Sequence, residues 1–100
     1  MNNKIEHLRM VSNPETAQRK AHSYLGKNAI LYPSTRKGKK YDIVNPSGKV
    51  VSFGSIDYED YTKHKDKDRR DRYLARATKM KGNWREDPYS PNNLSINILW

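Results

Sequence analysis

The sequence predicts an α+β fold in which a small antiparallel sheet of about three strands is packed against two to three helices. Two amphipathic runs with helix-start signals predict helices at 14–25 and 66–81. Between them, two short apolar runs flank Asn45-Pro46-Ser47-Gly48, which is typical of a β-hairpin turn. A third apolar run completes the sheet, because a two-stranded hairpin alone is marginally stable.

The chain is expected to divide into a polar N-terminal arm, residues 1–12, and one small domain, residues 13–100. The arm has only scattered apolar residues, so an extended arm and a short helical turn both fit it. Asn13 and Pro14 are typical of the position before a helix and of its first residue, respectively. Gly26 is well placed to end that helix, which predicts a helix over 14–25.

The three predicted strands cover residues 28–34, 39–45 and 49–54. The first is a short apolar run that ends at Pro33, and shortness favours a strand over a helix. The other two alternate apolar and polar residues on either side of the hairpin turn. After Gly54, the segment 57–62 fits either a short helical turn broken near His64 or the start of one continuous helix.

The longest predicted helix carries most of the positive charge. From Thr62 to Lys81 there are nine Lys/Arg against three Asp, which is +6 of the formal net charge of +9. At about 100° per residue, its bases fall in one sector and Tyr73, Ala77 and Met80 in the adjoining one. The apolar sector is expected to dock on a core, which leaves a positive ridge exposed.

A second basic segment, residues 34–40, has four Lys/Arg around Gly38 and no acid. It fits either a solvated hairpin tip or a loop that contacts phosphates. The predicted binding residues for nucleic acid or another partner are those of this loop and of the ridge: Arg36, Lys37, Lys39, Lys40, Arg69, Arg72, Arg76 and Lys79.

The last nine residues, from Asn92 to Trp100, are apolar enough to belong to the core or to a neighbouring molecule. Their alternation fits a strand. Ser90 followed by Pro91 instead fits the cap and first residue of a helix, and a short C-terminal helix is the preferred interpretation.

Composition argues against several functional classes. Without cysteine there is no disulfide scaffold and no thiolate zinc site. The sequence predicts neither a signal peptide nor a membrane span, which needs about 20 apolar residues. The histidines have no metal-ligand spacing, and no phosphate-binding glycine motif or nucleophile context occurs. We therefore expect no catalytic residue, no metal and no cofactor. His64 fits either a general base or, preferably, a residue that caps or bridges the helix start.

Several ordered blocks resemble a known family. These are STRKGKKYDIV, GKVVSFG, YEDYTKHKD, RRDRYLARA, GNW and PYSPNNLSINILW, which together span roughly residues 13–100. They resemble a small, basic, functionally uncharacterised protein family of nucleocytoplasmic large DNA viruses of algae and amoebae. The resemblance implies a viral protein located in the virion or inside the host cell, in the cytoplasm or viral factory, and not secreted. It supplies no catalytic residue.

The sequence and the family resemblance together leave two candidate functions. The preferred one is a non-enzymatic virion structural protein, such as a minor capsid or inner-layer component. It would contact other virion proteins, as an oligomer or assembly partner, through a basic and tyrosine-rich surface. The alternative is a sequence-independent nucleic-acid-binding protein for viral genome handling or packaging, whose Lys and Arg contact phosphates. Neither function involves a small-molecule substrate.

Overall fold

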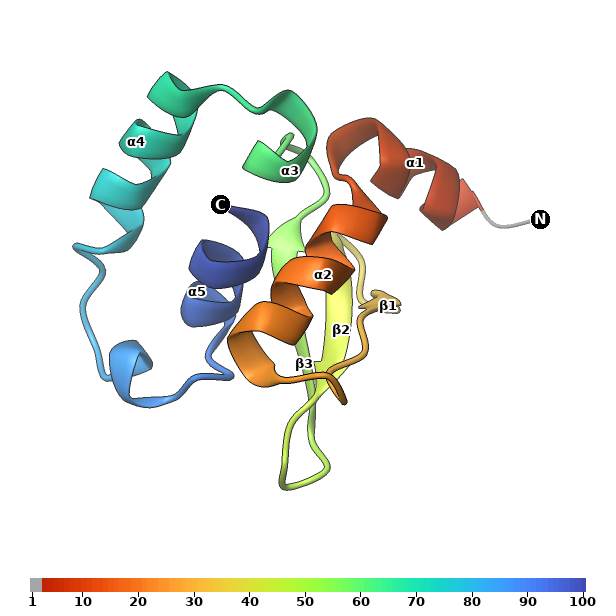
Figure 1. Cartoon of the computed structure of the whole chain (residues 1–100), viewed down its shortest axis with the longest axis vertical. Coiled ribbons are helices and arrows are strands. Elements are labelled where there is room, and N and C mark those ends of the chain that lie inside the picture. Colours follow the sequence, from red (N-terminus) through yellow and green to blue (C-terminus); the bar gives the residue numbers. More distant parts are fainter. Residues whose placement is uncertain (1–2) are drawn as a thin grey trace.

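The computed structural model describes residues 3–100, and its fold is α+β, as the sequence predicts. Three antiparallel strands form one sheet in the order β1 (Tyr32–Pro33), β2 (Lys39–Val44) and β3 (Val50–Ser55). Helix α2 (Pro14–Leu25) and the C-terminal helix that begins with α5 (Pro91–Leu94) lie against this sheet. Helix α4 (Lys67–Ala77) stands to one side of them (Figure 1).

The segment expected as a polar arm is helical from its third residue. Helix α1 spans Asn3–Val11, and the first two residues of that segment lie outside the described part of the chain. Leu8 is 1% exposed and belongs to the core cluster. The hydroxyl of Ser12, which follows the helix, is 2.7 Å from the Tyr41 hydroxyl of β2. Helix α1 therefore adds an apolar side chain to the core.

Helix α2 has the predicted bounds. The Asn13 side chain accepts a hydrogen bond from the Thr16 N–H (3.1 Å), and Pro14 is the first helical residue. At the other end, Gly26 has a φ of 108° and donates its N–H to the His22 carbonyl. Ala17 and Ala21 are fully buried, and their small side chains let the helix approach the core closely.

The hairpin lies within a residue of its predicted position, whereas the first strand is much shorter than predicted. Residues 29–31 do not pair with β2, because the Gln18 side chain on α2 occupies their backbone groups. Gln18 donates to the Ala29 carbonyl (2.8 Å) and accepts from the Leu31 N–H (2.9 Å). Strand β1 is therefore only two residues long, and the predicted strand 28–34 is wrong over most of its length.

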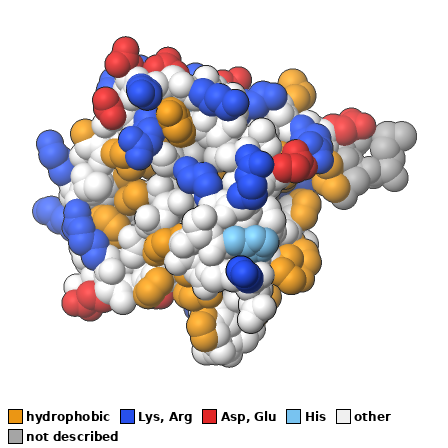
Figure 2. Space-filling view, viewed as in Figure 1, with side chains coloured by type: hydrophobic (Ala, Val, Ile, Leu, Met, Phe, Trp, Pro, Cys, Tyr) orange, Lys and Arg blue, Asp and Glu red, His pale blue; other side chains and the backbone are white. Residues whose placement is uncertain are grey.

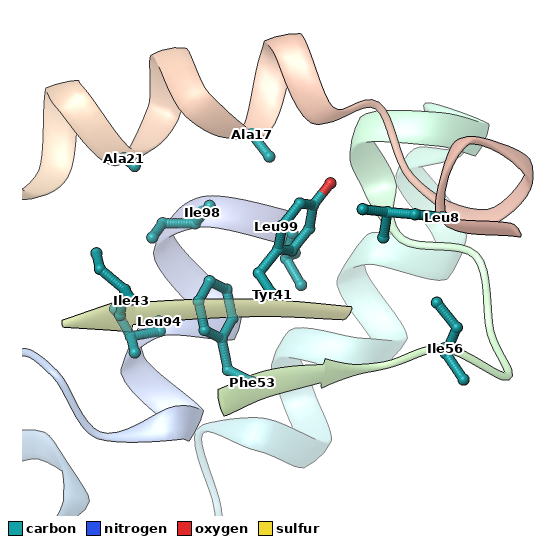
Figure 3. Packing of buried hydrophobic residues seen from close by; sticks show 10 residues of the cluster. All are labelled: Leu8, Ala17, Ala21, Tyr41, Ile43, Phe53, Ile56, Leu94, Ile98 and Leu99. Carbon is teal, nitrogen blue, oxygen red and sulfur yellow. The ribbon is translucent and has the colours of Figure 1, made fainter. Parts of the chain in front are cut away.

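The core lies between the sheet, α2 and the C-terminal helix. Tyr41 and Phe53 face each other across β2 and β3, with ring centroids 5.9 Å apart. Figure 3 shows these rings among aliphatic side chains from all three parts of the fold. The fully or almost fully buried apolar side chains include Leu8, Ile43, Phe53, Leu94, Ile98 and Leu99.

The helix predicted over 66–81 starts within one residue of its predicted position and ends early. A short helix, α3 (Tyr61–His64), ends at Lys65, whose φ of 57° lies in the left-handed region. Helix α4 then starts at Lys67, because the Asp66 side chain caps the N–H groups of Asp68 and Arg69. Of the two alternatives left open before this helix, the structure has the break near His64, with the short helix over 61–64 rather than 57–62. The helix ends at Ala77 rather than at residue 81, so Lys79 and Met80 lie beyond it.

The C-terminal segment is helical, which confirms the preferred prediction. The Ser90 side chain accepts from the Asn93 N–H, and Pro91 is the first helical residue. Helix α5 continues directly into a π-helical stretch, η2 (Ser95–Leu99). A 3-10 turn, η1 (Trp84–Glu86), joins this part to α4. Among residues 3–100, no helix has the length and apolar character needed to cross a membrane.

Candidate functional site

A cleft of about 680 Å³ opens between α4, the end of the hairpin and the C-terminal helix. One wall is α4, which contributes Arg72 and Arg76 among others. The hairpin contributes Lys39 and Ser55, and the C-terminal segment closes the cleft with Leu99, Trp100 and their neighbours. The cleft therefore joins segments that are more than forty residues apart in the chain.

Five of the eight predicted binding residues line this cleft: Lys39, Lys40, Arg69, Arg72 and Arg76. Arg72 and Arg76 are exposed and one helical turn apart, so they lie on one face of α4. Lys39, at the start of β2, is half-buried and comes from the other predicted segment. Figure 2 shows Lys and Arg side chains gathered on the side of the molecule where α4 lies.

Three predicted residues lie outside the cleft. Arg36 and Lys37 are exposed in the loop before β2, and the Arg36 carbonyl accepts a hydrogen bond from Lys4 of α1. Lys4 of α1 donates to the Lys39 carbonyl at 2.6 Å, which holds this loop against α1. Lys79 is exposed beyond the end of α4 and does not line the cleft.

Lys40, the eighth predicted residue, does not present its charge at the surface. Its ammonium is 3.0 Å from a carboxylate oxygen of Asp60, and the two side chains are 3% and 0% exposed. Burial lowers the pKa of Lys40, while the charge of Asp60 opposes that shift. Although Lys40 borders the cleft, its ammonium is committed to this ion pair. Its assignment as a surface binding residue is therefore corrected.

One acidic residue, Glu59, is among those lining the cleft. A carboxylate oxygen of Glu59 is 3.6 Å from the Arg69 guanidinium, and both side chains are about two-fifths exposed. This pair neutralises one of the four cleft bases other than Lys40 and is screened by water and salt. Lys39, Arg72 and Arg76 have no ion-pair partner among the described residues, so the cleft keeps an excess of positive charge.

Aromatic side chains form the inner wall. The Tyr73 and Trp100 rings stack with centroids 4.2 Å apart and planes 9° from parallel. The Arg70 side chain donates to the Trp100 backbone oxygen at 2.6 Å, so α4 is fastened to the C-terminal segment at two points. Burial raises the pKa of Tyr73. Tyr58 also lines the cleft, but its side chain is 69% exposed.

His64, the last residue of α3, lies beside the start of α4. Its Nδ1 accepts a hydrogen bond from the N–H of Asp66, the residue that caps α4. Its ring lies 5.1 Å from the Trp100 ring, and within the described chain its Nε2 is buried without a partner. No carboxylate is hydrogen-bonded to either ring nitrogen in that part of the chain.

The cleft combines positive charge with aromatic surface, which is the chemistry that binds phosphate-containing polymers. The charge pattern identified its Arg side chains and Lys39. It did not identify Tyr58, because a single exposed tyrosine has no sequence signal. It also did not identify Trp100 as part of the site, because the tail was expected to belong to the core or to a neighbouring molecule.

The fold and the cleft define a small basic α+β protein with one basic cleft among its described residues. Among known families, residues 29–77 are similar to a family of unknown function (DUF5754). This stretch contains the whole sheet, α3 and α4, but not the C-terminal wall of the cleft. No curated protein and no solved structure matches the chain.

Proposed function

We propose that this protein binds nucleic acid through the basic cleft, without sequence specificity and without catalysing a reaction. One observation carries the proposal. Bases from two distant segments, Lys39 on the hairpin and Arg72 and Arg76 on α4, line the same concave surface. Lys and Arg that contact phosphates supply most of the affinity in sequence-independent binding.

The shape and charge of the cleft support this function. Cation side chains on opposite walls suit an extended polyanion better than a single small anion, which needs converging donors. Arg72 and Arg76 reach water, so a partner can contact them without the protein rearranging. The sequence contains no established base-reading module, which supports binding without sequence preference.

The test is a variant with Lys39→Gln, Arg72→Gln and Arg76→Gln, measured by fluorescence anisotropy with a labelled oligonucleotide over a range of salt concentrations. Glutamine keeps the helix propensity of arginine and removes the charge. We expect affinity at low salt to fall about tenfold or more. The slope of log affinity against log salt should flatten by roughly two units, since each phosphate contact contributes about 0.7–0.9.

A matched control removes the same charge elsewhere. Arg19, Lys27 and Lys49 are exposed and do not line the cleft, so replacing them with Gln also lowers the net charge from +9 to +6. The proposal expects this control to bind nearly as the parent does. Equal losses in both variants would show that net charge alone causes binding, which would contradict a cleft site.

A second candidate is the virion structural protein expected from the family resemblance, with a place in the particle or the host cell interior. Exposed apolar side chains on the sheet favour it, because such residues are typical of protein contacts. Val44 and Val50 face each other across β2 and β3 and are 50% and 55% exposed. Tyr32 on β1 is 50% exposed. A fixed, high copy number in purified particles would support this role, and absence from particles would exclude it.

A further inference from the structure

We infer that the cleft takes single-stranded nucleic acid in preference to duplex, with one base stacked on Tyr58. This inference rests on the proposed function and names the form of nucleic acid that the site accepts. It combines three observations on the cleft: its size, the exposure of one aromatic ring and the distribution of its charges.

The size of the cleft favours a single strand. Its volume of about 680 Å³ lies in the range of sites that enclose a small organic ligand. A space of that size can enclose a nucleotide or two with the sugar-phosphate between them. A duplex presents a rigid convex surface with its phosphates on the outside and its bases stacked within. It can touch the rim of such a cleft, but it cannot enter.

Tyr58 is the aromatic residue in the cleft that is free to stack on a base. The Tyr73 and Trp100 rings cover each other, and the Trp100 ring also lies near His64. Tyr58 is 69% exposed, and no ring contact or cation–π contact involves it in the described chain. A ring held open to water beside a basic groove is the arrangement that binds unpaired bases, since every base offers a π-face.

The two unpaired arginines lie on a different wall from the Tyr58 ring, whereas Lys39 is on the hairpin. Arg72 and Arg76 are on α4, whereas Tyr58 follows β3 on the loop that leads toward α3. Glu59, next to Tyr58, is paired with Arg69, so its carboxylate repels a phosphate less than an unpaired one. A strand lying in the cleft would have its phosphates toward α4 and a base toward Tyr58. Duplex bases are paired and stacked on each other, so they cannot reach that ring.

The experiment compares a labelled single-stranded DNA oligonucleotide with the same sequence in duplex form, at one salt concentration. We expect the parent protein to bind the single strand more tightly. Tyr58→Leu should weaken single-strand binding about tenfold and leave duplex binding unchanged, because base–aromatic stacking is lost. Tyr32→Leu is the matched control, since Tyr32 is also exposed and lies outside the cleft.

A 2-aminopurine base placed in the strand reports stacking directly, because its fluorescence falls when it stacks on an aromatic ring. We expect quenching with the parent and with Tyr32→Leu, and less quenching with Tyr58→Leu. Equal affinity for both forms, or unchanged single-strand binding by Tyr58→Leu, would overturn the inference. The proposed function would then still stand if the three-charge cleft variant binds weakly. If the parent binds neither form, both proposals fail.

Discussion

Replacing Lys40 with Met would remove one partner of the buried ion pair and leave the other in place. Asp60 is fully buried, and its remaining side-chain partner is the Thr62 hydroxyl. An uncompensated carboxylate at such a site costs about 3–5 kcal/mol, because the charge has neither water nor a cation beside it. Met has a similar length and apolar character to the lysine stem, so packing changes little.

That cost is large for a chain of this size. Small domains are stable by about 5–15 kcal/mol, and a chain of 100 residues with 34% hydrophobic residues is expected near the lower end. For a domain of this length, a loss of 3 kcal/mol lowers Tm by roughly 12–24 °C. We expect Lys40→Met to melt far below the parent, with part of the protein unfolded at ordinary temperature.

Urea unfolding followed by far-UV circular dichroism measures the effect, and three further variants, including Asp60→Asn alone, identify its cause. Lys40→Met combined with Asp60→Asn removes both charges, and the amide can still accept from Thr62. This double variant should be more stable than the sum of the single losses predicts, by about 2–3 kcal/mol. Arg9→Gln breaks the exposed Arg9–Glu15 pair, whose N–O distance is 2.8 Å, and should change stability little.

Comparing Lys40→Met with Arg9→Gln shows whether burial or a short N–O distance sets the loss of stability. The exposed Arg9–Glu15 pair has the shorter distance, so distance alone would predict the larger loss there. If Lys40→Met costs no more than Arg9→Gln, the ammonium of Lys40 is reached by water. Lys40 would then be available to a partner at the surface, and it would return to the eight predicted binding residues.

Two other predictions concern the same end of the cleft. Removing Leu99 and Trp100 should lower stability by several kcal/mol, since Leu99 is 1% exposed and Trp100 stacks on Tyr73. Hydrogen exchange should quicken in α4, and a truncated protein that melts like the parent would contradict this. Burial, and then the charge of Arg69, hold the pKa of His64 below its ordinary value of 6.5. As pH falls below that value, the unfolded chain takes up a proton before the folded one, so stability falls from about pH 6.5 downward. Urea midpoints across that range should fall less for His64→Gln, and an unchanged fall would exclude His64 as its source.

Local rules predicted the parts of the fold whose causes are local. Asn13 and Pro14 start α2, and Ser90 and Pro91 start α5, because a capping side chain and a proline act within one turn of the chain. The hairpin turn is similarly local, since the Asn45 side chain accepts from the Lys49 N–H at 2.9 Å. These features require no knowledge of what packs against them.

Long-range partners decided the features that the sequence mispredicted or left open. Gln18 occupies the backbone of residues 29–31, and nothing in either segment signals that pairing. Asp60 lies 20 residues from Lys40, so the composition of the basic loop gives no sign that one of its lysines is buried. The short β1 and the loss of Lys40 from the site therefore have the same origin. In each case a distant side chain, Gln18 or Asp60, bonds the backbone or ammonium group that was expected to be available to another partner.

A charge count along the sequence overstates the number of binding residues, and salt dependence can measure by how much. If all eight predicted bases contacted single-strand phosphates, the log–log slope would be roughly −6, at about 0.7 per contact. The cleft offers four bases besides Lys40, of which Arg69 is paired with Glu59, so we expect roughly −2 to −3. Arg36 and Lys37 do not line the cleft, so a strand held there does not need them. A slope near −6 would mean that the strand leaves the cleft and runs along the loop, and the cleft would then be only part of the binding surface.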